Sequence, residues 1–367
     1  KDLKKIQKSL KLTVDKDIQF LIRDELIKFN QIFDTIGSAA VLMDVNNGEI
    51  LSMVSLPDFN PNKREKITDS NYINRVTKGV YEFGSVFKTF TLAAALNEKT
   101  IEPETEFNDL PKMLTCAGFP IREYDKKIPS DLTAEQILVR SGNIGSVRIV
   151  QQLGEQKFKL FLSKIGVLEP IIFDIEEVGA PIKFNWGKCP LATASYGHGI
   201  TTTLLQLAKA YSIIVNGGYE INPSLIMKYK NEKREKILNK DVSEKILPIL
   251  RKIVNTKEGT ASLADINGYE IGGKTGTAEK SIGGGYSKKK INTFVSIFPT
   301  SKPKFVLAVM LDEPKTNEDY IYHYRDGSNI KYKGTPFNTA GWTTVEVAGQ
   351  IIEKIGPILA TKYNQVN

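Results

Sequence analysis

The sequence predicts an α+β fold, in which an antiparallel five-stranded sheet is flanked by helices and an all-helical subdomain is inserted. Five short apolar runs read as strands: 39–44, 49–55, 271–275, 293–298 and 305–311. Between the two groups of strands, residues from roughly 98 to 210 have mainly helical patterning. Strands from both ends of a chain that enclose a helical middle are expected to share one sheet.

Flanking segments complete this division of the chain. Asn46-Asn47-Gly48 joins the first two runs and is a strong hairpin signal. Residues 18–29 and 343–355 have the apolar spacing of amphipathic helices, and Gly356-Pro357 is expected to end the second one. The predicted organisation is therefore a lead-in segment with a helix (1–36) and a main domain (37–367), with the helical subdomain at about 98–210.

Length and composition fit one large globular domain with an insertion. The chain has 367 residues, 41% of them hydrophobic, and a formal net charge of +8. We interpret this charge as a solvated, lysine-rich surface and not as a nucleic-acid site, because no nucleic-acid motif or interleaving of aromatic and basic residues occurs. The sequence has no apolar run of membrane-spanning length and no signal peptide.

The only two cysteines are Cys116 and Cys189. They lack clustered Cys or His neighbours, so we expect no metal site. Sequence leaves both a disulfide and two free thiols open.

Ser-x-x-Lys occurs four times, so the motif alone carries little information. Ser85 and Lys88 differ from the other matches because Gly84 precedes them and a mostly apolar helix (86–96) follows. A serine at a helix N-terminus is placed where developing negative charge is favoured, and a residue three positions on shares its face. A helix cap with a solvated lysine is the alternative. The other matches start in polar stretches, at Ser287, Ser301 and Ser328.

Two further motifs lie downstream. Ser141-Gly142-Asn143 is the only Ser-x-Asn, and it falls between two helical stretches. Lys274-Thr275-Gly276-Thr277 follows a short strand with two glycines, which allow close backbone approach. Each motif also has a purely structural interpretation. Ser141-Gly142-Asn143 could be a turn with a helix cap, and Lys274-Thr275-Gly276-Thr277 could be a strand that ends in a turn.

Together the motifs supply the parts of an acyl-transfer site. A serine hydroxyl needs a base. The chain has only two histidines, His198 and His323, so few residues could be the base of a Ser-His-Asp triad. Lysine can be that base when burial or a nearby cation lowers its pKa. We therefore assign Ser85 as nucleophile, Lys88 as base, Ser141 as proton relay and Lys274 as the second cation.

The remaining motif residues are expected to bind substrate. The Asn143 amide could orient a peptide group, and Lys274, Thr275 and Thr277 could hold a carboxylate through charge-assisted hydrogen bonds. Backbone N–H groups of Ser85 and Thr277 would form an oxyanion hole. The predicted substrate-binding set is Asn143, Thr275, Gly276 and Thr277, with no metal ligand and no cofactor.

The three motifs, in this order, resemble the signatures of penicillin-recognising acyltransferases. Over nearly all of its length, the chain is similar to the transpeptidase domain of a class B (monofunctional) penicillin-binding protein. Val80-Tyr81-Glu82-Phe83-Gly84-Ser85 is most similar to the division-specific branch, although many members have Pro at Phe83 and Thr at Val86. Other segments that carry the resemblance are 12–15, 48–53, 57–62, 196–200 and 259–261.

This resemblance implies a penicillin-binding/β-lactamase-like fold and a peptidoglycan D,D-transpeptidase. Ser85 would attack the penultimate D-Ala carbonyl of a stem peptide that ends in D-Ala-D-Ala, and an amine of a neighbouring stem would resolve the acyl-enzyme. Implied partners are stem peptides, β-lactam antibiotics, cell-division proteins and a glycan polymerase. An N-terminal membrane anchor ahead of this chain would hold it at the periplasmic face of the bacterial inner membrane.

Two other functions stay open. A serine β-lactamase or D,D-carboxypeptidase would need a base for deacylation, and Glu235-Lys236-Ile237-Leu238-Asn239 fits the Glu-x-x-Leu-Asn pattern of class A β-lactamases. We set it aside because this stretch resembles a peripheral hairpin in class B penicillin-binding proteins. A non-enzymatic β-lactam sensor is the other alternative. For His198, in Gly-His-Gly, we favour a structural role over proton donation.

Overall fold

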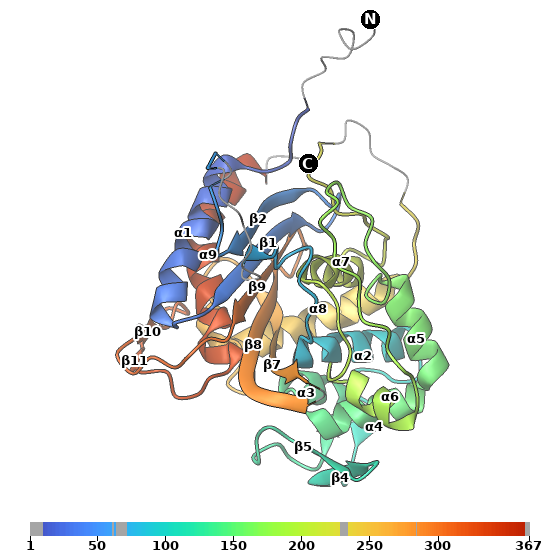
Figure 1. Ribbon diagram of the computed structural model, residues 1–367. Coiled ribbons are helices and arrows are strands. Elements are labelled where there is room, and N and C mark those ends of the chain that lie inside the picture. The colour runs from blue at the N-terminus through green and yellow to red at the C-terminus, as the bar shows by residue number, and fades with distance from the viewer. Residues whose placement is uncertain (1–9, 61, 64–71, 228–233, 284, 364–367) are drawn as a thin grey trace, which may run out of the picture.

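A computed structural model describes residues 10–60, 62–63, 72–227, 234–283 and 285–363 (Figure 1). Its centre is a five-stranded antiparallel sheet in the order β2-β1-β9-β8-β7. Strands from both ends of the chain share this sheet, which confirms the predicted fold class. The strands are β1 (Gly37–Asp44), β2 (Ile50–Leu56), β7 (Gly272–Ile282), β8 (Gly285–Phe298) and β9 (Phe305–Asp312).

The two hairpins of the sheet differ in how well their lengths were predicted. The turn between β1 and β2 lies at Asn46-Asn47-Gly48 as expected, with Gly48 at a φ of +78°. By contrast, β7 and β8 extend well beyond the predicted runs: β7 continues to Ile282, and β8 already begins at Gly285. Their outer halves are mostly exposed and polar. The apolar pattern therefore marked only the halves that are buried in the sheet.

Helices cover both faces of the sheet. On one face, α1 (Lys16–Ile32) packs beside α9 (Thr344–Lys362), and on the other lie α7 (Leu204–Val215) and α8 (Lys240–Asn255) (Figure 1). The Asp15 carboxylate accepts hydrogen bonds from two N–H groups of the first turn of α1, which starts the helix there. Within the described residues, no helix has both the length and the apolar character needed to cross a bilayer.

The predicted end of α9 at Gly356-Pro357 is wrong, because the helix continues to Lys362. Proline removes one backbone hydrogen bond, but Ile355 and Leu359 on either side of it are buried, and their burial outweighs that loss. Gly356 has a packing role instead. A Cβ on Gly356 would lie 2.1 Å from the Tyr269 ring, so glycine lets the helix approach that ring.

Behind the sheet, α2 (Phe87–Asn97) runs through the inserted region and is buried from Phe87 to Leu96. Four helices of the insertion follow it: α3 (Ala134–Val139), α4 (Asn143–Leu153), α5 (Glu155–Lys164) and α6 (Lys188–Ala194). The structure adds two short strand pairs to this region. These are β3 (Glu106–Phe107) with β6 (Leu132–Thr133), and β4 (Met113–Cys116) with β5 (Phe119–Arg122). A further pair, β10 (Ile321–His323) with β11 (Lys331–Lys333), precedes α9.

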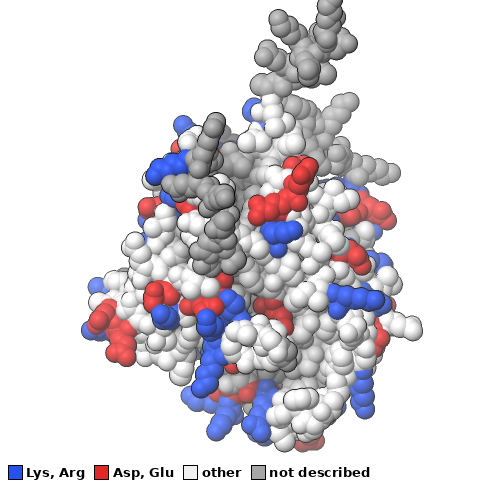
Figure 2. All heavy atoms as spheres, in the orientation of Figure 1, with Lys and Arg blue, Asp and Glu red and all other residues white. Residues whose placement is uncertain are grey.

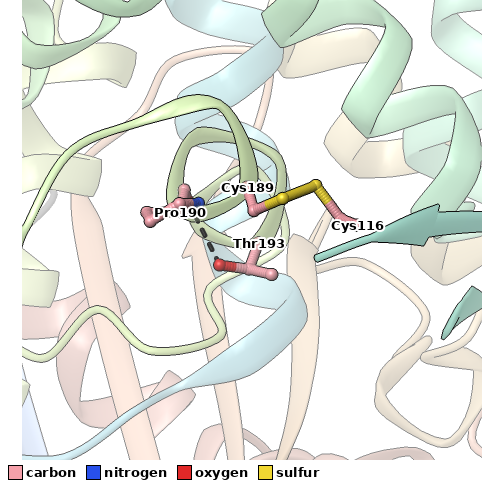
Figure 3. The surroundings of a disulfide bond; sticks show 4 residues. All are labelled: Cys116, Cys189, Pro190 and Thr193. Carbon is pink, nitrogen blue, oxygen red and sulfur yellow. Dashed lines mark hydrogen bonds between the residues drawn. A yellow bond between two sulfur atoms is a disulfide. The ribbon is translucent and has the colours of Figure 1, made fainter. Parts of the chain in front are cut away.

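A disulfide ties the β4–β5 hairpin to α6. Cys116 ends β4 and bonds Cys189 in the first turn of α6, with the two Cα atoms 5.5 Å apart (Figure 3). Of the two alternatives that the sequence left open, the structure has the disulfide. It closes a long loop, because the cysteines are 73 residues apart in the sequence.

We expect replacement of both Cys116 and Cys189 by serine to lower the free energy of unfolding by about 2–4 kcal/mol. The bond restricts the unfolded chain more than the folded one, and the effect grows with the length of the closed loop. Urea unfolding of the oxidised parent and of the double variant measures the difference, and the reduced parent is the control. Equal unfolding midpoints for oxidised parent and double variant would contradict this expectation.

Candidate active site

One cavity of about 1680 Å³ collects residues from all three motifs. Its walls come from the turn before α2, from the loop between α3 and α4, and from β7. The predicted site residues that line it are Ser85, Ser141, Asn143, Thr275 and Thr277, while Lys88 and Lys274 lie buried behind its surface.

The rim of this cavity is rich in cations. Arg122, Lys126, Lys127 and Lys290 line it together with the acids Glu82, Asp125 and Glu279. Figure 2 shows that Lys and Arg side chains gather toward the lower end of the drawn face, where Figure 1 places the β4–β5 and β7–β8 hairpins. Cations and acids are thus mixed along the cavity lining.

The turn that carries Ser85 is held by backbone contacts. Ser85 is half-buried in a 3₁₀ turn, η2 (Gly84–Val86), just before α2, and Gly84 has a φ of +59°. The predicted break before the nucleophile helix is thus confirmed. A Cβ on Gly197 would lie 2.1 Å from the Gly84 carbonyl oxygen, and one on Gly276 would lie 2.1 Å from that of Phe83. Gly276 therefore lets β7 lie directly against the serine turn.

Thr277 presents its backbone to the same turn. It lies on the edge strand β7, and its carbonyl oxygen is 2.7 Å from where a Cβ on Gly84 would be. In an antiparallel pair, the N–H and C=O of one residue point to the same side. The Thr277 N–H therefore also points away from β8 and toward the serine turn, which is the placement that an oxyanion hole with Ser85 requires.

Two buried lysines share the hydroxyl of Ser141. The Lys88 Nζ donates to the Ser141 carbonyl oxygen (2.5 Å), to Asn143 Oδ1 (2.7 Å) and to Ser141 Oγ (3.2 Å). The Lys274 Nζ donates to Ser141 Oγ (2.9 Å) and to the Thr275 carbonyl oxygen (3.2 Å). The exposed fractions of Lys88, Lys274 and Ser141 are only 1%, 0% and 3%. The Ser141 hydroxyl thus connects the two amines.

Burial changes the protonation of both amines. It lowers the pKa of Lys88 to about 7, although the nearby negative charge of Glu123 opposes this change. Burial, together with the positive charge of Lys88, holds the pKa of Lys274 well below its ordinary value. A substantial fraction of the Lys88 amine is therefore uncharged at neutral pH.

One predicted contact is missing from the hydrogen bonds of the described residues. None of them joins Ser85 Oγ to Lys88 Nζ, whose bonds go to Ser141 and Asn143 instead. A protonated lysine has three N–H donors on a flexible stem, and it loses one of them when it becomes the uncharged base. In this structure three oxygens of the segment 141–143 accept from that amine.

Hydrogen bonds to residues 122 and 123 fix the loop that carries Ser141 and Asn143. Ser141 has a φ of +57°, a conformation that is uncommon for residues other than glycine. The Glu123 carboxylate accepts from the N–H groups of Asn143 (2.6 Å) and Ile144 (2.9 Å), and Asn143 Nδ2 donates to the Arg122 carbonyl oxygen (2.7 Å). Sequence reasoning missed Glu123, which no motif or periodicity connects to this loop.

Two threonines of β7 are held by neighbouring segments. The Thr275 hydroxyl lies 2.6 Å from that of Thr260, and the Thr277 hydroxyl accepts from the Ala340 N–H at 3.0 Å. Sequence reasoning gave Thr260 no role in the site. Its signal was the Gly-Thr-Ala segment at 259–261, which was used only for the family resemblance.

His198 belongs to an aromatic and acidic cluster on the cavity wall. Its ring stacks on Tyr286 with centroids 4.5 Å apart, and its Nδ1 is 3.8 Å from Glu82 Oε2. Glu82 also accepts from the Tyr286 hydroxyl (2.9 Å) and the Gly199 N–H (2.8 Å). This placement fits a structural role. Glu235 is exposed and is not among the residues that line the cavity.

Comparison with known proteins gives a consistent result. The model of the penicillin binding protein transpeptidase domain matches residues 38–328. The chain is 30% identical over 363 residues to the probable peptidoglycan D,D-transpeptidase FtsI of Caulobacter vibrioides, and this match covers 96% of the chain and 59% of that protein. It is 31% identical over 324 residues to the stage V sporulation protein D of Bacillus subtilis, covering 83% of the chain and 50% of that protein.

Solved structures agree with this assignment. The apo structure of the TP domain from Burkholderia pseudomallei penicillin-binding protein 3 superposes with a TM-score of 0.80 at 26% identity, and the match covers 96% of this chain and 97% of that one. The chain spans little more than half the length of the curated relatives described above. Because the family model covers most of the chain and the fold agrees, the chain belongs to the penicillin-binding protein transpeptidase domain family.

Proposed function

We propose that the chain is a peptidoglycan D,D-transpeptidase with Ser85 as its nucleophile. The observation that carries this proposal is the hydroxyl of Ser141, which two buried amines share at the wall of a cavity that Ser85 also lines. A serine without a histidine partner needs an uncharged amine, and Lys88 supplies one because its pKa is lowered to about 7.

In the acylation step, Ser85 Oγ attacks the carbonyl carbon of the penultimate D-Ala, and the Lys88 amine takes the proton of the hydroxyl. The backbone N–H groups of Ser85 and Thr277 stabilise the negative charge on the carbonyl oxygen. As the C–N bond breaks, Ser141 donates its proton to the leaving amine of D-Ala. The amine network around Ser141 returns a proton to it.

In the second step, the amine of a neighbouring stem peptide attacks the ester carbonyl of the acyl-enzyme. Its proton passes through the same network, and Ser85 leaves with a proton restored to its hydroxyl. An amide cross-link replaces the ester. A β-lactam presents a reactive carbonyl to the same serine and forms the same kind of ester, so β-lactams are expected ligands.

Substrate binding would use the other residues of the motifs. Asn143 would orient a peptide group, and Thr275 and Thr277, which line the cavity on either side of Gly276, would bind the terminal carboxylate. The Lys274 amine lies buried next to the Ser141 hydroxyl and belongs to the proton network. The individual cations of the cavity lining, Arg122, Lys126, Lys127 and Lys290, would pair with carboxylates of the stem peptide.

The cellular setting is also a proposal. The relatives named FtsI and stage V sporulation protein D suggest a role in the cell wall at division or sporulation. We propose that this chain acts with division proteins and a glycan polymerase. It would work at the periplasmic face of the inner membrane, held there by an N-terminal anchor.

A fluorescent penicillin with peptide mapping tests the proposal. We expect label on the peptide that contains Ser85, none in the Ser85→Ala variant, and full label in Ser328→Ala, which removes one of the other Ser-x-x-Lys matches. The parent should also join a D-Ala-D-Ala-terminated donor to an added amine. Label on another residue would overturn the site, and rapid turnover of a chromogenic β-lactam would favour a β-lactamase. Stable label without transfer would favour a sensor.

A further inference from the structure

Three consecutive residues at the end of β5 and just beyond it, 122–124, hold the loop that carries Ser141 and Asn143. Arg122 accepts at its carbonyl oxygen from Asn143 Nδ2 (2.7 Å), and Glu123 accepts from two N–H groups at the start of α4. Tyr124 donates its hydroxyl to the Arg140 carbonyl oxygen (3.2 Å), at the end of α3. Three consecutive residues therefore bond the segment 140–144 on both sides of Ser141.

The carboxylate of Glu123 replaces a helix cap that α4 lacks. The N-cap position is Gly142, which has no side chain to accept from the first free N–H groups of the helix. Each oxygen of Glu123 accepts one of these groups, from Asn143 at 2.6 Å and from Ile144 at 2.9 Å. A negative charge at this end of a helix is also favoured by the helix dipole.

The amide of Asn143 is fixed in one direction as a result. Because its nitrogen donates to the carbonyl oxygen of Arg122, its oxygen must point the other way, where it accepts from Lys88 Nζ at 2.7 Å. A shift of the first turn of α4 would move this oxygen away from the Lys88 amine. The disulfide Cys116–Cys189 anchors the hairpin that leads into this segment.

We propose that Glu123 is a positioning residue of the acyl-transfer site: it holds the first turn of α4 so that the Asn143 side chain keeps the Lys88 amine in the cluster around Ser141. This role rests on the proposed function. Glu123 does not line the cavity, so it acts through Asn143 and Lys88 and not on the substrate.

Two variants separate the hydrogen bonds of Glu123 from its charge. Glu123→Ala removes both acceptors, and we expect acylation by penicillin to slow about a hundredfold, which is the typical result of displacing a reacting group by about 1 Å. Glu123→Gln keeps one acceptor oxygen, so we expect a smaller loss of about tenfold. Glu106→Gln, which removes an exposed carboxylate from β3 of the same insertion, is the matched control and should react like the parent.

A double-mutant cycle shows whether Glu123 acts through Asn143. If it does, Glu123→Ala should slow acylation much less in an Asn143→Ala background than in the parent. A Glu123 that only stabilises the fold would slow acylation by the same factor in both backgrounds, and that additive result would overturn the proposal. Melting temperatures of all four proteins report any loss of folded enzyme.

The pH profile gives a second readout that a purely structural role would not move. Lys88 reacts when unprotonated, so acylation rises with pH through the pKa of Lys88. The charge of Glu123 raises this pKa, and Glu123→Gln should therefore move the rise to lower pH. An unchanged rate and an unchanged profile, with the parent still labelled on Ser85, would overturn only the role of Glu123. A parent without label on Ser85 would instead overturn the proposed function.

Discussion

Replacing Lys88 by methionine is expected to slow acylation of Ser85 by about a thousandfold or more while the protein stays folded. The substitution removes the proposed general base, and general-base catalysis typically contributes about 10²–10⁴ in rate. Methionine is also unbranched and flexible, so it fills a similar space. The position is buried, with an exposed fraction of 1%, and a neutral side chain avoids the cost of removing an amine from water. The acylation rate should therefore fall while the free energy of unfolding changes little.

Lys209→Met is the matched control for this variant. Lys209 is another buried lysine, with an exposed fraction of 9%, and burial lowers its pKa as well. It does not line the cavity, and its amine bonds Asn222 Oδ1 at 3.2 Å. Stopped-flow acylation by penicillin should be close to the parental rate in Lys209→Met. If Lys88→Met reacted as fast as this control, Lys88 would not be the base.

The pH dependence of the parent follows from the same amine. Because burial lowers the pKa of Lys88 to about 7, the unprotonated form gains population as the pH rises through that value. The acylation rate should therefore rise through about pH 7 and level off above it. An exposed lysine would give a rise near pH 10.4, so the position of the rise reports whether the base is buried.

The sheet and the motifs could be predicted because their signals are local. Apolar runs marked the strands that are buried in the sheet, and the helix that follows Ser85 is mostly apolar because it is buried from Phe87 to Leu96. The motif order then placed Ser85, Ser141 and Lys274 in one site. The structure brings Ser141 and Lys274 into contact and places Ser85 in the wall of the same cavity.

What the sequence did not show depends on contacts between distant segments. Glu123 accepts a hydrogen bond from the first turn of α4, although it lies 20 residues earlier in the sequence. No periodic pattern in the sequence indicates this contact. Pro357 stays within α9 because buried neighbours outweigh one lost hydrogen bond, and local rules cannot weigh that balance. The Ser141 hydroxyl was expected as a proton relay, but the bonds of Lys88 to the Ser141 carbonyl oxygen and to Asn143 Oδ1 were missed, because these acceptors become available only after folding.

The structure shows a packing reason for glycine at position 276. Its place in the Lys-Thr-Gly-Thr motif suggested a part in substrate binding, and its lack of a side chain has a clear effect on packing. A Cβ at this position would lie 2.1 Å from the Phe83 carbonyl oxygen and 3.0 Å from Val86 Cγ1. Because the first of these atoms belongs to the backbone, the serine turn and β7 would have to move apart.

We therefore expect Gly276→Ala to slow acylation by about a hundredfold, since a displacement of about 1 Å between a nucleophile and its oxyanion donor is typically that costly. The crowding should also lower the free energy of unfolding by about 1–3 kcal/mol. Gly142→Ala, in the loop between α3 and α4, is the matched control. Its Cβ would meet no atom closer than Glu123 Oε1 at 3.6 Å, so acylation and stability should stay near parental values. Parental acylation by Gly276→Ala would show that the turn and the strand can separate without harm to the oxyanion hole.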